Sequence, residues 1–266
     1  MLPEQRRYEI LSVVKRRGAV SVNDLCELFS ITPTTARKDL AELGQRGSII
    51  RTHGGALNPG YARGHDVSLE TRQNLQSREK TSIAEAAVAH VRPGDTILLD
   101  DSSTVSYLAR LLKDMQSLTV VTYALDVVNV LSTAPGIRLM VIGGAFDAES
   151  KAFAGGPAED MLSQLHVDKA FFSPKGVSLD AGLTDARMDQ ARLHRRVIAS
   201  AAERVLMVDS SKFDVVCFAE VAPLDVVQLI ITEREPSQRY VTLWEKRGVQ
   251  LEIARGPARP GTGVAG

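Results

Sequence analysis

The chain has 266 residues, 44% of them hydrophobic, which is enough to form two globular domains or one large domain with an appendage. Its 32 basic and 32 acidic side chains cancel, so overall charge cannot drive nucleic-acid binding and only local charge is left for that role. The two cysteines lack metal-type spacing, no apolar run approaches a membrane span, and no signal-peptide core follows Met1, so we expect a cytoplasmic protein without disulfides, metal, cofactor or membrane partner.

Three helices are predicted near the start of the chain. Residues 4–17 are amphipathic and end in a basic turn before a glycine. Ser21 is placed to cap a second helix, and only a three-residue turn separates this helix from the next. Thr32 caps the third helix, and Pro33 stands where no amide hydrogen bond is needed. This spacing indicates a helix-turn-helix.

The third helix presents polar side chains away from its apolar stripe of Ala36, Leu40 and Leu43. The residues that are free to face a partner include Thr34, Thr35, Arg37 and Lys38. A short β-branched strand follows and turns through glycines, bringing Arg51 and His53 into a hairpin. Residues 1–57 hold nine basic and six acidic residues, a local charge of +3. A solvated helix face would explain the charges alone, but the helices and hairpin together predict a winged helix that binds DNA.

A polar linker is predicted at residues 58–77, and the pattern changes after it. Between residues 78 and 253, short apolar runs alternate with helical patterns. The runs cover residues 96–99, 118–122, 138–142, 169–172, 205–208, 226–231 and 249–253, and the helices cover 78–91, 104–113, 124–133, 157–165, 187–202 and 237–247. This alternation predicts one α/β domain with a mostly parallel sheet covered on both faces. Residues 254–266 are rich in Gly, Pro and Ala and are predicted to be disordered.

Polar residues follow several of the predicted strands. Ligands of open α/β sheets bind beyond the carboxyl ends of the strands, where helix N-termini offer free amides. The candidate residues at these ends are Asp100, Ser102, Ser103, Thr104, Gly144, Lys175 and Lys212. Two further candidates, Thr184 and Asp185, stand just before the predicted helix that begins at Arg187. The hydroxyls and amides suit a phosphate or carboxylate, and the lysines suit any anion. Simpler alternatives stay open, because a serine or Asp185 can serve only as a helix cap and a lysine after a strand can be merely solvated.

The residues also resemble a known family. ARKDLAELGQRGSIIRTHGGA, LLDDSSTVSYLARLL, VIGGAFDAESKAFAGGPAEDML, VDKAFFSPKGVSLDAGLTD and VLMVDSSKF resemble, in order, motifs of DeoR-type bacterial transcriptional regulators. The resemblance implies a winged helix-turn-helix followed by a sensor domain similar to ribose-5-phosphate isomerase and CoA transferase. It also implies that Asp100, Ser102, Ser103 and Thr104 hold the phosphate of a sugar-phosphate effector, with the other candidates completing the pocket.

We therefore expect a repressor of a sugar or polyol catabolism operon rather than an enzyme. Arg37 and Lys38 would reach base edges or phosphates, Thr34 and Thr35 would contact phosphates, and Arg51 and His53 would hold the backbone beside the wing. A homodimer or homotetramer would span two half-sites of the operator. The alternatives are a sugar-phosphate isomerase with a fused DNA-binding appendage, and a protein-interaction module that does not bind DNA.

Overall fold

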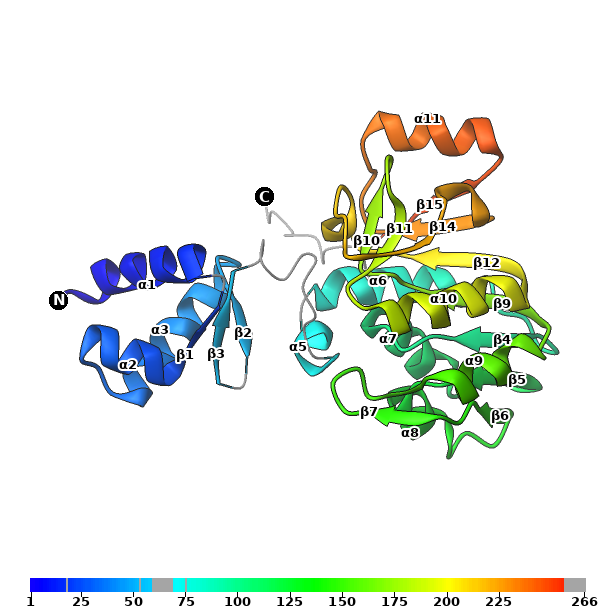
Figure 1. The fold of residues 1–266 in the computed structure, drawn as a ribbon, viewed down its shortest axis with the longest axis horizontal. Helices are drawn as coiled ribbons and strands as arrows, with labels where there is room; N and C mark the ends of the chain where they lie inside the picture. The colour runs from blue at the N-terminus through cyan, green and yellow to red at the C-terminus, as the bar shows by residue number, and fades with distance from the viewer. Residues whose placement is uncertain (18, 53, 59–68, 75, 256–266) are drawn as a thin grey trace, which may run out of the picture. The chain divides into compact units, whose positions relative to one another are not determined.

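The computed structural model describes residues 1–17, 19–52, 54–58, 69–74 and 76–255. The prediction for His53, the central part of the predicted linker and nearly all of the predicted tail lie outside these residues. The chain divides into an N-terminal unit, Met1–Val67, and a C-terminal unit, Ser68–Gly266 (Figure 1). In the described part, no helix is both long and apolar enough to cross a membrane.

The N-terminal unit is a winged helix. It contains α1 (Pro3–Arg17), β1 (Ala19–Ser21), α2 (Val22–Phe29), α3 (Pro33–Gln45), β2 (Ile50–Thr52) and β3 (Gly55–Leu57). Ser21 and Thr32 cap α2 and α3 as predicted, each accepting a backbone N–H with its side-chain oxygen. The three helices enclose a core of buried aliphatic residues, and the strands pair in the order β1-β3-β2. Gly55 has to be a glycine, since a Cβ there would lie 1.9 Å from the carbonyl oxygen of Val20.

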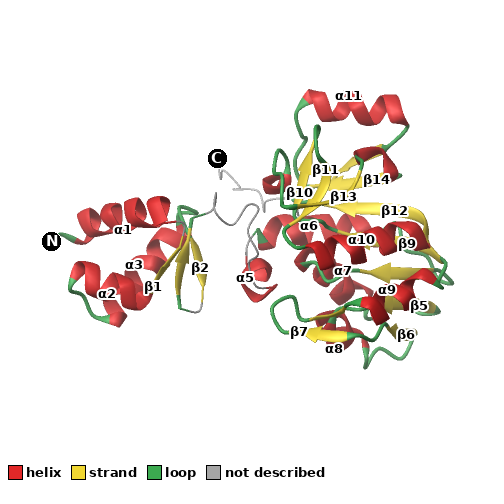
Figure 2. Ribbon diagram, in the orientation of Figure 1, coloured by secondary structure: helices red, strands yellow, loops and turns green. Residues whose placement is uncertain are grey.

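The C-terminal unit is built on a parallel sheet of seven strands, ordered β15-β14-β12-β9-β4-β5-β6 (Figure 2). The strands are β4 (Thr96–Leu99), β5 (Leu118–Thr122), β6 (Ile137–Val141), β9 (Val167–Phe172), β12 (Ala201–Met207), β14 (Leu229–Thr232) and β15 (Gln250–Ile253). Each of them overlaps one of the seven apolar runs. The predicted class, a mostly parallel sheet in an α/β unit after a winged helix, is confirmed.

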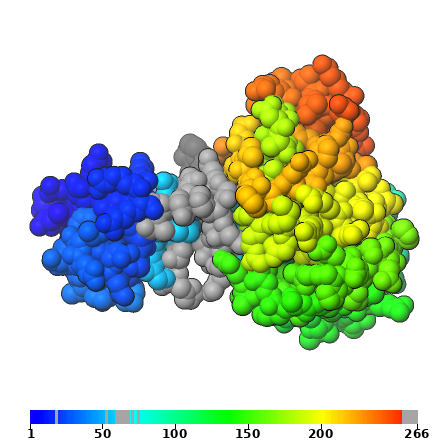
Figure 3. Space-filling model, in the orientation of Figure 1, coloured from blue at the N-terminus to red at the C-terminus, as the bar shows by residue number. Residues whose placement is uncertain are grey.

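Helices cover both faces of this sheet. One face packs against α6 (Ser77–Val88), α7 (Ser103–Leu112) and α8 (Leu125–Leu131). The other packs against α9 (Gly156–Ser163), α10 (Met188–Ser200) and α11 (Gln238–Arg247). On the face drawn in Figure 3, the early segments in green and the later segments in yellow to red form one continuous surface. The two buried layers explain why the strands are apolar along their whole length.

In the described part of the C-terminal unit, the sequence did not predict five short strands that pair antiparallel. These are β10 (Gly176–Ser178), β11 (Gly182–Asp185) and β13 (Ala219–Ala222) in one sheet, and β7 (Ala145–Asp147) with β8 (Ala152–Ala154) in another. Two single turns, η1 (Ser210–Lys212) and η2 (Leu224–Val226), complete the unit. Strands of three or four residues are too short to show an alternating pattern.

The predicted linker, residues 58–77, needs a correction. Its last part forms α5 (Leu69–Asn74) and the start of α6. Leu69 is only 1% exposed, and its N–H donates to the Glu149 carbonyl oxygen at 3.2 Å. Burying this leucine against the C-terminal unit stabilises a helix that local sequence does not signal.

Candidate functional site

The α3 surface carries the predicted nucleic-acid contacts. Thr34, Arg37 and Lys38 are exposed, while Thr35 is half-buried and gives its N–H to the Thr32 hydroxyl. Arg51 is exposed on β2, and its side chain lies against the end of α3, since a Cβ on Gly44 would be 3.0 Å from the Arg51 Cδ. One helix therefore presents hydroxyls and cations at its N-terminal half, with an arginine from the wing beside its C-terminal half.

Two other arginines of this unit serve its scaffold. The carboxylate of Asp39 is buried on α3, and Arg6 Nε lies 2.6 Å from it. Arg7 Nη1 lies 2.8 Å from Glu42 and 3.5 Å from Asp39. These ion pairs join α1 to α3 and commit two of the nine basic side chains of residues 1–57 to the scaffold. Arg46 at the end of α3 lies 3.1 Å from Glu4, so Arg37, Lys38 and Arg51 are the cations left without an ion pair among the described residues of α3 and the wing.

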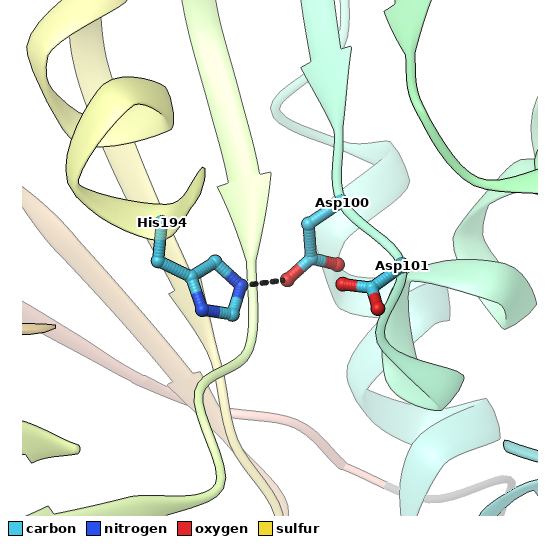
Figure 4. A group of neighbouring side chains, drawn as sticks. All are labelled: Asp100, Asp101 and His194. Atoms are coloured by element: carbon cyan, nitrogen blue, oxygen red, sulfur yellow. Dashed lines mark hydrogen bonds and ion pairs between the residues drawn. The ribbon is translucent and has the colours of Figure 1, made fainter. Parts of the chain in front are cut away.

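In the C-terminal unit, the carboxylate of Asp100 organises the edge where β4 and β9 end. Asp100 Oδ1 accepts the Ser102 N–H at 2.9 Å, and Oδ2 accepts the Ser173 N–H at 2.7 Å. Oδ2 also lies 3.0 Å from His194 Nε2 (Figure 4). The side chain is fully buried, and the His194 cation and the N–H donors offset the cost of burial and hold its pKa below the usual range. Asp100 joins two strand ends and α10.

His194, which the sequence prediction missed, bridges two aspartates. Its Nδ1 lies 2.5 Å from Asp185 Oδ2, and its Nε2 faces Asp100. Burial alone would lower the pKa of the imidazole, but Asp185 and Asp100 outweigh it and raise the pKa to about 10. We therefore assign an imidazolium that donates both N–H groups. The predicted residue Asp185 lies at this site but holds His194 instead of capping a helix.

The geometry of Asp100, Asp101 and His194 would also suit a divalent cation, because their ligand atoms lie within 4.8 Å of one another. A metal ligand must be an unprotonated imidazole, whereas each nitrogen of His194 is matched to a carboxylate. Burial, followed by the charge of Asp100, raises the pKa of Asp101, which lessens the negative charge that a cation would balance. The arrangement therefore fits a protonated hydrogen-bond network better than a metal site.

Lysines approach the same edge. Lys212 Nζ donates to the Ser173 hydroxyl at 2.6 Å and to the Pro174 carbonyl at 2.7 Å. Lys175 is half-buried, and its backbone N–H donates to Asp185 at 3.3 Å. Burial lowers the pKa of Lys212 despite the attraction of nearby aspartates. An anion placed here would favour the charged form of Lys212.

Lys80 on α6 is a second cation that the sequence prediction missed. It is 3% exposed, and its Nζ donates to the Arg72 carbonyl oxygen. Burial lowers its pKa to about 7, with Asp209 opposing this shift and the Lys212 and Arg72 charges adding to it. A signal was present in the sequence, because Lys80 shares a helical stripe with the buried residues at 83, 84 and 87.

The hydroxyl residues divide into engaged and available groups. Ser102 caps α7 by accepting the Val105 N–H at 3.2 Å, as the simpler interpretation of this serine as a helix cap predicts. Thr184 is also engaged, accepting the Cys217 N–H at 3.0 Å. Ser103 lies buried in the first turn of α7. Within the described residues, the Thr104 hydroxyl is buried without a hydrogen-bond partner. Thr104 is therefore the hydroxyl that a ligand would satisfy.

Gly144 and a surface cavity beside β11 lie elsewhere. Gly144 precedes β7, where a Cβ would stand 2.5 Å from the Ala154 carbonyl oxygen, so its glycine is needed for packing. A cavity of about 430 Å³ lies beside β11 and β13 and is lined by Thr184, Cys217 and Phe218 among others. The Asp100–Thr104 loop is not part of that lining and is itself buried. The candidate site is thus a closed polar cluster.

Comparison with known proteins gives matches along most of the chain. Residues 6–59 match the DeoR-like helix-turn-helix domain, and residues 75–234 match the DeoR C terminal sensor domain. The HTH-type transcriptional repressor GlcR of Bacillus subtilis is 32% identical over 95% of this chain and 97% of its own length. The glycerol-3-phosphate regulon repressor of Escherichia coli is 28% identical over 95% of this chain and 100% of its own. Among solved structures, a D-ribose-5-phosphate isomerase is similar over 53% of this chain and 55% of its own, at 16% identity and a TM-score of 0.38.

Proposed function

The chain belongs to the DeoR family of bacterial transcriptional regulators, and we propose that it is a DNA-binding repressor of a carbohydrate catabolism operon whose effector is a phosphorylated carbohydrate. The observation that supports the effector class is the buried loop Asp100–Thr104 at the start of α7. Amides and hydroxyls gather there, the half-buried Lys212 bonds Ser173 and Pro174 at the same edge of the sheet, and the charge of Lys212 acts in turn on the buried Lys80. Helix N-termini and lysines of this kind favour phosphate.

On the DNA side, Arg37 and Lys38 would read base edges or hold phosphates in the major groove, and Thr34 and Thr35 would contact phosphates. Arg51 and His53 would hold the backbone beside the wing. One unit with so few exposed cations binds weakly at physiological salt, which favours a dimer or tetramer on two half-sites. The relatives with descriptive names are regulators and repressors, which supports a non-enzymatic role.

The effector site would comprise the Asp100–Thr104 loop, here called the phosphate loop, and the cations around it. Ser103 and Thr104 offer the hydroxyl and amide groups at the start of α7, while Asp100 and Asp185 hold the loop through His194. Lys212 bonds Ser173 and Pro174, just after the end of β9, and we add Lys80, on which the charge of Lys212 acts. Ser102, Thr184, Lys175 and Gly144 would act mainly through their structural roles.

A ligand screen with two matched threonine variants tests this proposal. Phosphorylated sugars, but not the free sugars, should raise the unfolding midpoint of the full chain, by the equivalent of about 2.7 kcal/mol at a hundred times Kd. Thr104→Val should keep or slightly raise the stability of the protein yet lower its affinity for the best ligand about tenfold. The Thr104 hydroxyl has no partner in the described protein and would bond only the ligand. The best ligand should also change the affinity of the chain for DNA.

Thr122→Val is the matched control. Thr122 is equally buried, but its hydroxyl donates to the Leu99 carbonyl at 2.8 Å and accepts the Ala124 N–H at 3.1 Å. Its loss should cost about 1–3 kcal/mol of stability and leave ligand affinity unchanged. Full ligand affinity in Thr104→Val would contradict the assigned pocket, and no response to any phosphorylated sugar would contradict the effector class.

The affinity for a phosphorylated ligand should fall as pH rises from about 7 to 9. The pKa of Lys80 is about 7 in the free protein, and an anion binds best to its charged form. The phosphate group is already a dianion above pH 7, so the decline in affinity reflects deprotonation of the protein and not of the ligand. Titration calorimetry across this range should show the decline in wild type and a much smaller one in Lys80→Met. A flat wild-type profile would exclude Lys80 from the site.

A further inference from the structure

Helix α5, the first described element after residues 59–68, is held by contacts from four different segments. The Leu69 N–H donates to Glu149, and Lys80 Nζ donates to the Arg72 carbonyl oxygen. The Tyr107 hydroxyl donates to the Gln73 carbonyl oxygen at 3.0 Å, and the Gln73 amide donates to the carboxylate of Asp126 on α8. In Figure 1, α5 lies beside α7, the helix that begins in the phosphate loop.

The phosphate loop is closed in this structure. All five side chains from Asp100 to Thr104 are 6% exposed or less. A ligand of sugar-phosphate size therefore reaches the loop only if a neighbouring segment moves. Helix α5 has only six residues and is held by the buried Leu69 and a few hydrogen bonds, so displacing it costs less than displacing the longer helices α6 and α7.

The side chain of Arg72 belongs to the same electrostatic environment as the loop. Burial lowers the pKa of Lys80 and of Lys212, and the positive charge of Arg72 acts in the same direction on both. Burial raises the pKa of Asp101, and Arg72 opposes that shift. Arg72, Lys80 and Lys212, on α5, α6 and η1, thus carry charges that repel one another, and Lys80 Nζ also bonds the Arg72 carbonyl oxygen. A dianion bound among these cations would turn the repulsion into attraction.

We propose that α5 is the element that couples effector binding to DNA binding, with Arg72 contacting the bound anion. The proposal rests on the proposed function, because it needs an anion at the Asp100–Thr104 loop. Along the chain, residues 59–68 connect α5 directly to the DNA-binding unit. A change in the position of α5 therefore acts where this connection begins. The effector shifts the equilibrium by the difference between its affinities for the two positions of α5.

Hydrogen exchange of the full chain tests this proposal, with inorganic phosphate as the probe and chloride at equal ionic strength as the control. We expect amides of α5 and of the Asp100–Leu112 segment to exchange at least about threefold more slowly in saturating phosphate. The amides of α11, which packs on the other face of the sheet, should not respond. Unchanged or faster exchange in α5, with protection of the loop, would overturn the coupling role.

The same measurement separates the two proposals. If neither the loop nor α5 responds to phosphate or to any phosphorylated sugar, the proposed effector class is wrong. If the loop alone responds, only the coupling proposal is wrong. Arg72→Gln should lose the α5 response, whereas Arg78→Gln, which removes the same charge from an exposed position on α6, should keep it. An intact α5 response in Arg72→Gln would overturn the role of Arg72.

Discussion

Replacing His194 by alanine lowers the free energy of unfolding by about 3–5 kcal/mol, because it leaves two buried carboxylates without their shared cation. Asp100 and Asp185 are both 1% exposed or less, and each is bonded to the imidazole. Water cannot replace the lost charge at such depth. The same substitution at His166, which is exposed, should change stability by less than about 0.5 kcal/mol.

Urea unfolding of the three proteins measures this effect, and its pH dependence gives a second readout. The pKa of His194 is raised from 6.5 to about 10 in the folded chain, so its stabilisation is complete below pH 6.5 and is lost as pH rises toward 10. The lowered pKa of Lys80, about 7, contributes a slope of opposite sign over the same window, so the Lys80→Met protein isolates the His194 contribution. Lys80→Met should lose stability across this window, by up to about 1.4 kcal/mol per pH unit, and adding His166→Ala should leave that slope unchanged. A flat profile in Lys80→Met would contradict the imidazolium, even if His194→Ala does not fold.

Replacing both Arg37 and Lys38 by alanine should weaken specific DNA binding by about 2–6 kcal/mol, since each good base contact contributes about 1–3 kcal/mol. Both side chains are exposed on α3, opposite the buried stripe, so the fold should be retained. The probe is a duplex selected by the wild-type protein from a random pool. The slope of log affinity against log salt should also fall by about one for each lost phosphate contact.

The matched control is Lys15→Ala with Arg16→Ala on α1, which removes the same two charges from exposed positions. That pair should lower affinity much less, because α1 lies outside the recognition helix. Circular dichroism would confirm that both double variants are folded. Equal losses in the two would indicate general charge attraction, and unchanged affinity in the Arg37 and Lys38 variant would remove α3 from the interface.

Much of the fold could be predicted because its signals are local. Capping residues and apolar stripes placed α2 and α3, and continuous apolar runs marked each strand of the parallel sheet. The antiparallel strands β10, β11 and β13 escaped prediction, since segments this short are strands only because they pair with one another. Helix α5 escaped for a similar reason, as its stability comes from burying Leu69.

The candidate pocket was predicted only in part. Asp100 and Lys212 follow predicted strands, so the rule for carboxyl ends found them, and Asp185 was found because it stands just before a predicted helix. Lys80 and His194 lie inside helices, each within a stripe of buried apolar residues, and a titratable residue in such a stripe was the available signal. What each group does there could not be read from its position, because a cap, an ion pair and a ligand contact all use the same residue types.

The sequence by itself determined the family, the order of the two units and the positions of the main helices and parallel strands. Apolar periodicity, capping and motif order are properties of neighbouring residues, so they can be read without the fold. Only the tertiary structure decided the protonation of His194, the closure of the Asp100–Thr104 loop and the place of α5 beside α7. Those features depend on charges brought together from positions up to 94 residues apart and on their removal from water.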